Sequence, residues 1–174
     1  MSKNKKYNNL NQIVEGFSSS KVSFISFDIF DTLLLRPMEH AEDVYRLLDR
    51  YFEEQQSAFI SFQKLRTEAE AVLRRKIIHK EWKREEVHLE DIYQVLVDDF
   101  GMDSLIADSM MKKELELEFA LSLPRKSGQV LYQKAKETGK KVILISDMYL
   151  SKEQIQAMLE KNGYEKPDAI FVSS

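Results

Sequence analysis

The chain has 174 residues, of which 43% are hydrophobic and 32% are charged, and its formal net charge is -3. This length suits one domain with an insert, and the charge gives no basic stripe of the kind that nucleic-acid-binding proteins carry. Because the chain has no cysteine, a disulfide framework, a thiolate metal site and a cysteine nucleophile are excluded, and we expect a cytoplasmic protein. No apolar run approaches the roughly 20 residues of a membrane-spanning helix, so no membrane partner is expected.

Short apolar runs predict the strands of a parallel sheet. These runs occupy residues 22–27, 142–145 and 169–172. The first run lacks helical spacing, and we expect it to be buried on both faces of the sheet. Amphipathic helical patterns accompany the runs at residues 10–17, 129–138 and 151–162. Strands that alternate with helices in this way favour parallel pairing with right-handed crossovers.

The pattern changes between the first and second predicted strands. Residues 39–122 predict about four amphipathic helices and no strand, and Pro37 and Pro124 mark the ends of this block. The predicted fold class is therefore α/β, with a partial, three-stranded parallel sheet of Rossmann-like type and an inserted all-helical cap. We divide the chain into an α/β core, residues 1–36 and 124–174, and a cap, residues 37–123.

Polar side chains follow two of the predicted strands at the point where each strand ends. The first strand runs into Asp28, and the second runs into Ser146 and Asp147. In an open parallel sheet, ligands bind at the carboxyl ends of the strands. A carboxylate held there can act as a nucleophile, and a hydroxyl with nearby backbone N–H groups can bind a phosphate oxygen. Either residue alone is more often a turn former, but the pair on consecutive strands favours a site.

These strand ends resemble motifs of the haloacid-dehalogenase-like (HAD) superfamily of hydrolases. Residues 26–34, SFDIFDTLL, look like its first motif, and residues 142–147, VILISD, look like its second. The predicted insert lies where many members carry a helical cap. The longer segment FDIFDTLLLRP, residues 27–37, also resembles the corresponding segment of a subgroup found in bacterial surface-polysaccharide and glycosyltransferase contexts. The resemblance covers nearly the whole chain and implies a HAD-like Rossmannoid fold and hydrolytic activity.

The resemblance also implies roles for individual residues. Asp28 matches the nucleophile, Thr32 matches the residue that orients it, and Ser146 matches the phosphate-binding hydroxyl. In the phosphatases of the family, magnesium is held partly by the first carboxylate and by a backbone carbonyl, which here are Asp28 and Phe30. The implied activity is magnesium-dependent hydrolysis of a small phosphorylated molecule, such as a sugar phosphate, through an aspartyl-phosphate.

Two further residues are candidates for substrate binding. The backbone N–H of Asp147 could serve the phosphate while its side chain caps the following turn. Arg36 follows the first motif and enters the predicted cap. Its guanidinium could reach a substrate phosphate or could instead pair with a carboxylate of the cap, and both alternatives stay open.

The position of the general acid departs from the family pattern. Family phosphatases carry a second Asp two residues after the nucleophile, whereas this chain has Phe30 there and Asp31 one place later. Asp31 is therefore the candidate replacement. Family dehalogenases carry an aromatic residue at this position, because a departing halide needs no proton. A metal-independent, dehalogenase-like hydrolase is thus the alternative to a phosphatase.

The third and fourth motifs of the family, which supply a lysine and a late acidic pair, do not occur before Ser174. We therefore expect a C-terminally truncated chain that binds magnesium weakly or not at all, and a non-catalytic interaction module is a third alternative. With only three strands, the strand at 22–27 would have an unpaired apolar edge. We expect this edge to be covered by the N-terminal helix, by a second chain in a dimer, or by disorder.

Overall fold

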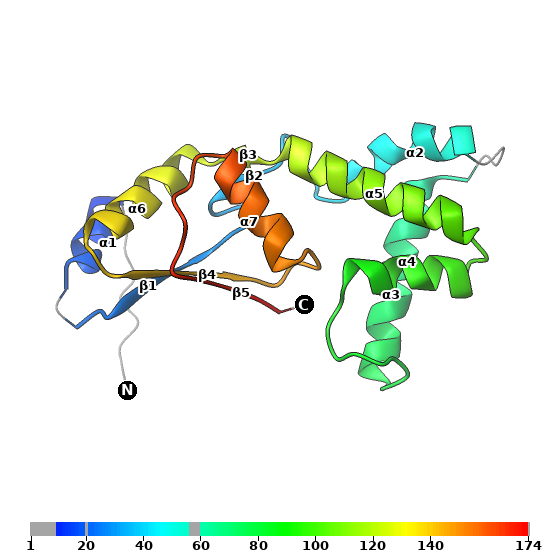
Figure 1. Ribbon diagram of the computed structural model, residues 1–174, viewed down its shortest axis with the longest axis horizontal. Coiled ribbons are helices and arrows are strands. Elements are labelled where there is room, and N and C mark those ends of the chain that lie inside the picture. Colours follow the sequence, from blue (N-terminus) through cyan, green and yellow to red (C-terminus); the bar gives the residue numbers. More distant parts are fainter. Residues whose placement is uncertain (1–9, 20, 56–59, 174) are drawn as a thin grey trace.

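The computed structural model describes residues 10–19, 21–55 and 60–173, so the first nine residues that the sequence assigned to the core lie outside it. Figure 1 shows an α/β part and a helical part joined by a narrow neck. In chain order, the elements are α1 (Leu10–Phe17), β1 (Phe24–Asp28), β2 (Leu34–Leu35), α2 (Asp43–Gln55), α3 (Phe62–Ile78), α4 (Leu89–Asp98), α5 (Ser104–Leu121), β3 (Leu123–Pro124), α6 (Lys126–Glu137), β4 (Lys141–Ser146), α7 (Lys152–Lys161) and β5 (Ala169–Val172).

The main sheet has the order β1-β4-β5, and both pairings are parallel. This confirms the predicted α/β class and the predicted three-stranded parallel sheet. Asp28 lies opposite Ile145, and Ser146 lies opposite Val172. The sequence did not predict the short antiparallel pair β2–β3, in which the chain leaves the sheet layer and later returns to it. We call the segment between these two strands the helical insert.

Helices cover one face of the main sheet. Figure 1 shows α6 and α7 on this side, with α1 beside α6. On β1, the rings of Phe27 and Tyr132 of α6 lie 5.8 Å apart, whereas Phe24 on the same strand is 58% exposed. The prediction that the first strand is buried on both faces is therefore wrong. Within the described residues, Ile145 and Phe171 continue the uncovered apolar face beyond Phe24.

One edge of β1 carries no strand in the described part of the chain, because β1 pairs only with β4. This agrees with the unpaired edge expected from the sequence. Phe17 of α1 contacts Phe27 edge to face at 6.1 Å between the ring centroids, so α1 packs against the buried face of the strand. Pairing of a second chain along this edge stays a prediction.

The helical insert folds as a small bundle in which α2 packs on α3 and α5, and α4 packs on the same two helices. Its interior holds Arg66, which is fully buried and donates two hydrogen bonds of 2.9 Å to Glu114. The rings of Tyr45, Tyr93 and Tyr149 surround the guanidinium, with centroids 4.6, 5.9 and 5.0 Å from it. Such a buried pair is tolerated because the charges are matched and hydrogen-bonded.

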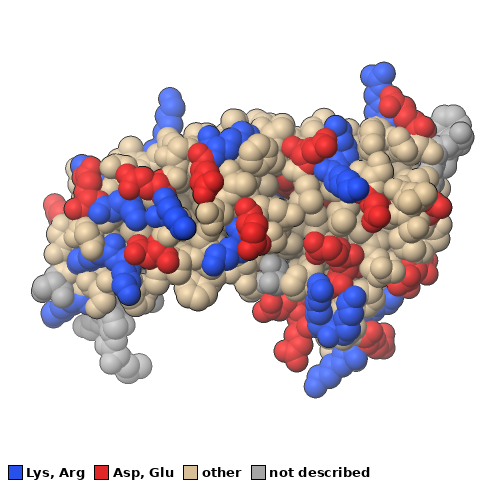
Figure 2. Space-filling view, viewed as in Figure 1, with Lys and Arg blue, Asp and Glu red and all other residues tan. Residues whose placement is uncertain are grey.

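Charged side chains of both signs are spread over the drawn face of the molecule (Figure 2). There, acidic and basic side chains are intermixed over both parts of the molecule. None of the helices among the described residues combines the length and the apolar character that a bilayer crossing requires.

Ile170 and Phe171 are neighbours on β5 that point to opposite faces of the sheet, with exposed fractions of 7% and 58%. Ile170→Ala should lower the free energy of unfolding by about 2–4 kcal/mol, because it leaves a cavity beneath the helices. Phe171→Ala should change it by no more than about 0.5 kcal/mol. Urea denaturation followed by circular dichroism measures both values. Equal losses would mean that the outer face is also covered in solution.

Candidate functional site

Parallel pairing places the last residues of β1 and β4 at the same edge of the sheet. Asp28 ends β1 and Ser146 ends β4, and both line one pocket of about 370 Å³. The other residues that line it are Ser26, Phe27, Ile145, Asp147 and Ser173. The structure therefore brings together three residues that the sequence singled out, namely Asp28, Ser146 and Asp147.

Ser26 and Ser173 line the same pocket and were missed at the level of sequence. Ser26 stands two residues before Asp28, so the alternation of a strand points both side chains to the same face. Ser173 directly follows β5, and its backbone N–H donates to the carbonyl of Ser146 at 2.9 Å. The signal for Ser173 was available: it is the polar residue that ends the third strand, as Asp28 and Ser146 end the first two.

The carboxylate of Asp28 is exposed and held in one orientation. The hydroxyl of Thr32 donates to its Oδ2 at 2.8 Å. A tight turn makes this contact possible, because the N–H groups of Leu33 and Leu34 both donate to the carbonyl of Ile29, at 2.7 and 2.9 Å. The turn folds Thr32 back toward the strand end. This contact is the one expected of a residue that orients a nucleophile.

The start of helix α6 and Tyr164, which follows α7, both contact this turn. The backbone N–H of Arg125 donates to the carbonyl of Leu33 at 2.8 Å, and the hydroxyl of Tyr164 donates to the same carbonyl at 2.5 Å. Gly128 lies so close that an added Cβ would stand 2.3 Å from the carbonyl oxygen of Thr32. A glycine is therefore required where the helix crosses the turn.

Asp31 is not among the residues that line the pocket. Its backbone adopts a left-handed conformation, with φ at 59°, which Asp tolerates better than most residues. Its N–H donates to the carbonyl of Leu34 at 2.7 Å, and its own carbonyl accepts from the guanidinium of Arg125. The turn therefore fixes the main chain of Asp31, and the structure does not bring its side chain together with Ser146.

Ser146 is almost fully buried, at 3% exposure, at the floor of the pocket. Its Oγ accepts a hydrogen bond from the N–H of Met148 at 3.3 Å. Because the oxygen acts there as an acceptor, its O–H can still be donated to an anion. Asp147 is exposed, and besides this pocket it lines an adjoining groove of about 380 Å³ next to α3.

Arg36 points into the helical insert and does not line the pocket. Its Nε and Nη2 donate to the two carboxylate oxygens of Glu118 on α5, at 2.8 and 3.1 Å, and its guanidinium lies 4.8 Å from the ring centroid of Phe30. Of the two alternatives left open, the structure shows the carboxylate pair. Burial by itself lowers the pKa of Arg36, but the hydrogen bond and charge of Glu118 outweigh it and raise the pKa above its ordinary value.

The oxygen donors expected to hold magnesium are the Asp28 carboxylate and the Phe30 carbonyl. Among the residues that the structure describes, no three of His, Cys, Asp and Glu gather where they could share a metal ion. Magnesium commonly takes one or two protein carboxylates and completes its shell with substrate phosphate and water. Two hard oxygen donors therefore fit magnesium that binds together with a phosphate, and they do not make a protein-only cage.

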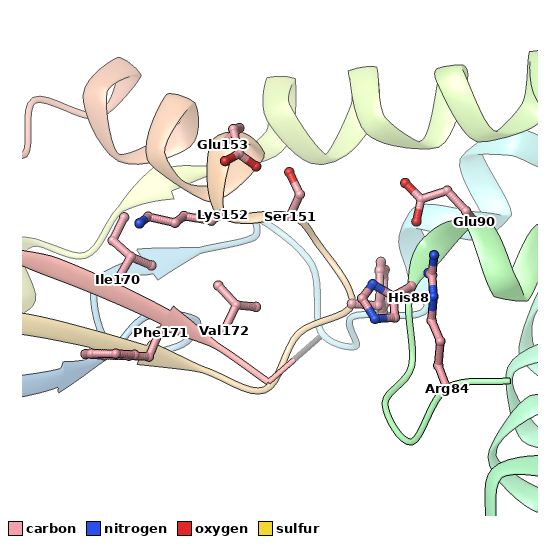
Figure 3. A pocket seen from close by; sticks show the side chains of 10 residues that line it. Arg84, His88, Glu90, Ser151, Lys152, Glu153, Ile170, Phe171 and Val172 are labelled. Carbon is pink, nitrogen blue, oxygen red and sulfur yellow. The ribbon is translucent and has the colours of Figure 1, made fainter. Parts of the chain in front are cut away.

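A larger cleft of about 540 Å³ separates the helical insert from the core (Figure 3). Its lining carries both charges, and Arg84 there already pairs with Asp91 at 3.2 Å. Ser151, also in the lining, caps α7 by accepting from the N–H of Gln154. Asp28 and Ser146 do not line this cleft. We therefore take the smaller pocket, which Asp28 and Ser146 both line, as the candidate site.

The chain matches no protein-family model and no curated protein sequence. The observations that carry the candidate site are the shared pocket of Asp28 and Ser146 and the hydrogen bond between Thr32 and Asp28.

Gly128→Ala tests whether α6 presses on the turn that orients Asp28. A Gly→Ala change inside a helix usually stabilises a protein by about 0.5–1 kcal/mol. Here it should destabilise by about 1–3 kcal/mol, because the new Cβ overlaps the Thr32 carbonyl. Val130→Ala, at an exposed position of the same helix, is the matched control and should change stability little. A gain in the urea midpoint for Gly128→Ala would disprove the close contact.

Proposed function

We propose that this chain is a HAD-like hydrolase whose helical insert serves as a cap, and that it acts as a magnesium-dependent phosphatase of a small phosphorylated metabolite. The observation that carries the proposal is the common pocket of Asp28 and Ser146, with Asp28 oriented by Thr32. Its volume of about 370 Å³ lies within the range of small-ligand sites. The resemblance of residues 26–34 and 142–147 to the family motifs supports the same conclusion.

The proposed reaction has two displacement steps at phosphorus. A carboxylate oxygen of Asp28 attacks phosphorus and forms a P–O bond, while the bond from phosphorus to the leaving oxygen breaks and that oxygen takes a proton from solvent water. Water then attacks phosphorus, which releases inorganic phosphate and restores the Asp28 carboxylate. Ser146 donates its O–H to a phosphoryl oxygen, and Thr32 holds the attacking carboxylate in place. Magnesium bound through Asp28 and the Phe30 carbonyl would offset the repulsion between carboxylate and phosphate.

Turnover of p-nitrophenyl phosphate with magnesium tests this function. Asp28→Asn should reduce the rate to background, because the amide is not a nucleophile. Ser146→Ala should lower kcat/KM by about 10²-fold, because one donor to the phosphoryl oxygen is lost. Glu137→Gln removes an exposed carboxylate of α6 outside the pocket and serves as the control. Circular dichroism establishes that each variant is folded. Equal rates for wild type and Asp28→Asn would rule out the mechanism.

Phe30 favours a second candidate, a metal-independent hydrolase that attacks carbon. Its ring is held beneath the guanidinium of Arg36 at the position where a phosphatase of the family carries its general acid. In this alternative, Asp28 displaces a halide from carbon and forms an ester, which needs no protonated leaving group. Water then attacks the acyl carbon of the ester, which releases the alcohol and restores the carboxylate.

Reactions in ¹⁸O-labelled water distinguish the two candidates. Hydrolysis of an aspartyl-phosphate at phosphorus should place the label in inorganic phosphate and leave Asp28 unlabelled. Hydrolysis of an ester at the acyl carbon should place it in the carboxylate of Asp28. Mass spectrometry of the peptide that contains residue 28, after turnover of p-nitrophenyl phosphate or a 2-haloalkanoate, gives the answer. Halide release that persists in a chelator would favour the carbon-attacking enzyme, and strict dependence on magnesium would exclude it.

A further inference from the structure

We propose that Glu118 is a positioning residue, a single buried carboxylate of the helical insert that sets the spacing between the two site loops. One loop, residues 29–36, follows Asp28, and the other, residues 147–150, follows Ser146. Glu118 lies on α5, far from both loops in sequence, and its side chain is 1% exposed. The inference rests on the proposed function in taking Asp28 and Ser146 as the reacting pair.

The first arm runs from Glu118 to the loop after Asp28. Arg36 donates to both carboxylate oxygens, and its own side chain is 9% exposed. The same guanidinium packs over the ring of Phe30, which stands two residues after Asp28. A two-point, charge-assisted pair excluded from water is both strong and directional. It therefore fixes the far end of the loop and the ring of Phe30 at once.

The second arm runs from Glu118 to the loop after Ser146. The hydroxyl of Tyr149 donates to Oε1 of Glu118 at 3.4 Å and lies 3.0 Å from the hydroxyl of Tyr45. Because Tyr149 uses its only proton toward Glu118, Tyr45 must be the donor in the second contact. The residue before Tyr149, Met148, donates its N–H to the Oγ of Ser146. Movement of Tyr149 would therefore disturb the contact that orients the Ser146 hydroxyl.

The chain contains its own control for this role. Glu114 lies one turn earlier on α5, is fully buried, and accepts from Arg66 and from the hydroxyl of Tyr93. Both of these partners belong to the helical insert. Glu114 and Glu118 thus share a helix, a chemistry and a degree of burial, but only Glu118 is hydrogen-bonded to residues of both site loops. Glu114 reaches the second loop only indirectly, through the contact of Arg66 with the ring of Tyr149.

Amide hydrogen exchange measured by mass spectrometry tests the role without any assumption about activity. Glu118→Gln should speed exchange at least about tenfold in peptides covering residues 29–36 and 147–150, because both arms lose their charged acceptor. Glu114→Gln should speed exchange in the insert and leave residues 29–36 as in wild type; residues 147–150 can respond weakly, because Arg66 packs on the ring of Tyr149. If Glu114→Gln also speeds exchange in both loops, Glu118 is only a general contributor to stability and the proposal is overturned. Unchanged exchange in both loops of Glu118→Gln would overturn it as well.

Separate variants test each arm and cover the case in which Glu118→Gln does not fold. Tyr149→Phe removes one hydroxyl and should speed exchange in residues 147–150 alone, whereas Arg36→Met should do so in residues 29–36 alone. With p-nitrophenyl phosphate, Glu118→Gln should lower kcat/KM at least tenfold, and Glu114→Gln should lower it less than threefold. If wild type shows no turnover, the proposed function fails, and the exchange pattern still decides whether Glu118 positions the loops.

Discussion

The parallel pairing of β1 with β4 is the interaction on which the rest of the molecule depends. Parallel neighbours need a long crossover, and here the intervening chain holds the helical insert and α6. Because both strands run in the same direction, Asp28 and Ser146 emerge at one edge of the sheet. Antiparallel strands would place these residues at opposite edges and leave no common pocket. The register, with Asp28 opposite Ile145, then sets how far apart the two loops begin.

The helical insert is joined to this edge by buried polar contacts as well as by the β2–β3 neck. Burial raises the pKa of Tyr45 to about 12 and raises that of Tyr149 well above its ordinary value. Both hydroxyls therefore keep their protons near neutral pH and remain hydrogen-bond donors. In a medium of low dielectric constant, such contacts are stronger than the same contacts at a surface. This explains how two parts with a narrow covalent connection can hold one geometry at the site.

The uncovered face of the sheet is the other main feature of this fold. Parallel sheets are normally covered on both faces, yet Phe24, Ile145 and Phe171 are each more than half exposed in the described residues. Asp28 belongs to the same face, because side chains of a strand alternate with a period of two residues and Asp28 follows Phe24 by four. The access of ligands to Asp28 is consequently tied to whatever lies against this face.

Local patterns in the sequence predicted the helices, the strands of the main sheet and the candidate site residues, because periodicity, strand-ending polar residues and helix signals depend only on neighbours along the chain. They predicted the three parallel strands, the helical insert, and Asp28 and Ser146 as candidate site residues. Tertiary structure alone decided what each element faces. One face of β1 is open, Asp31 lies outside the pocket, and Arg36 binds Glu118, because packing partners from distant parts of the chain determine burial, side-chain direction and pairing.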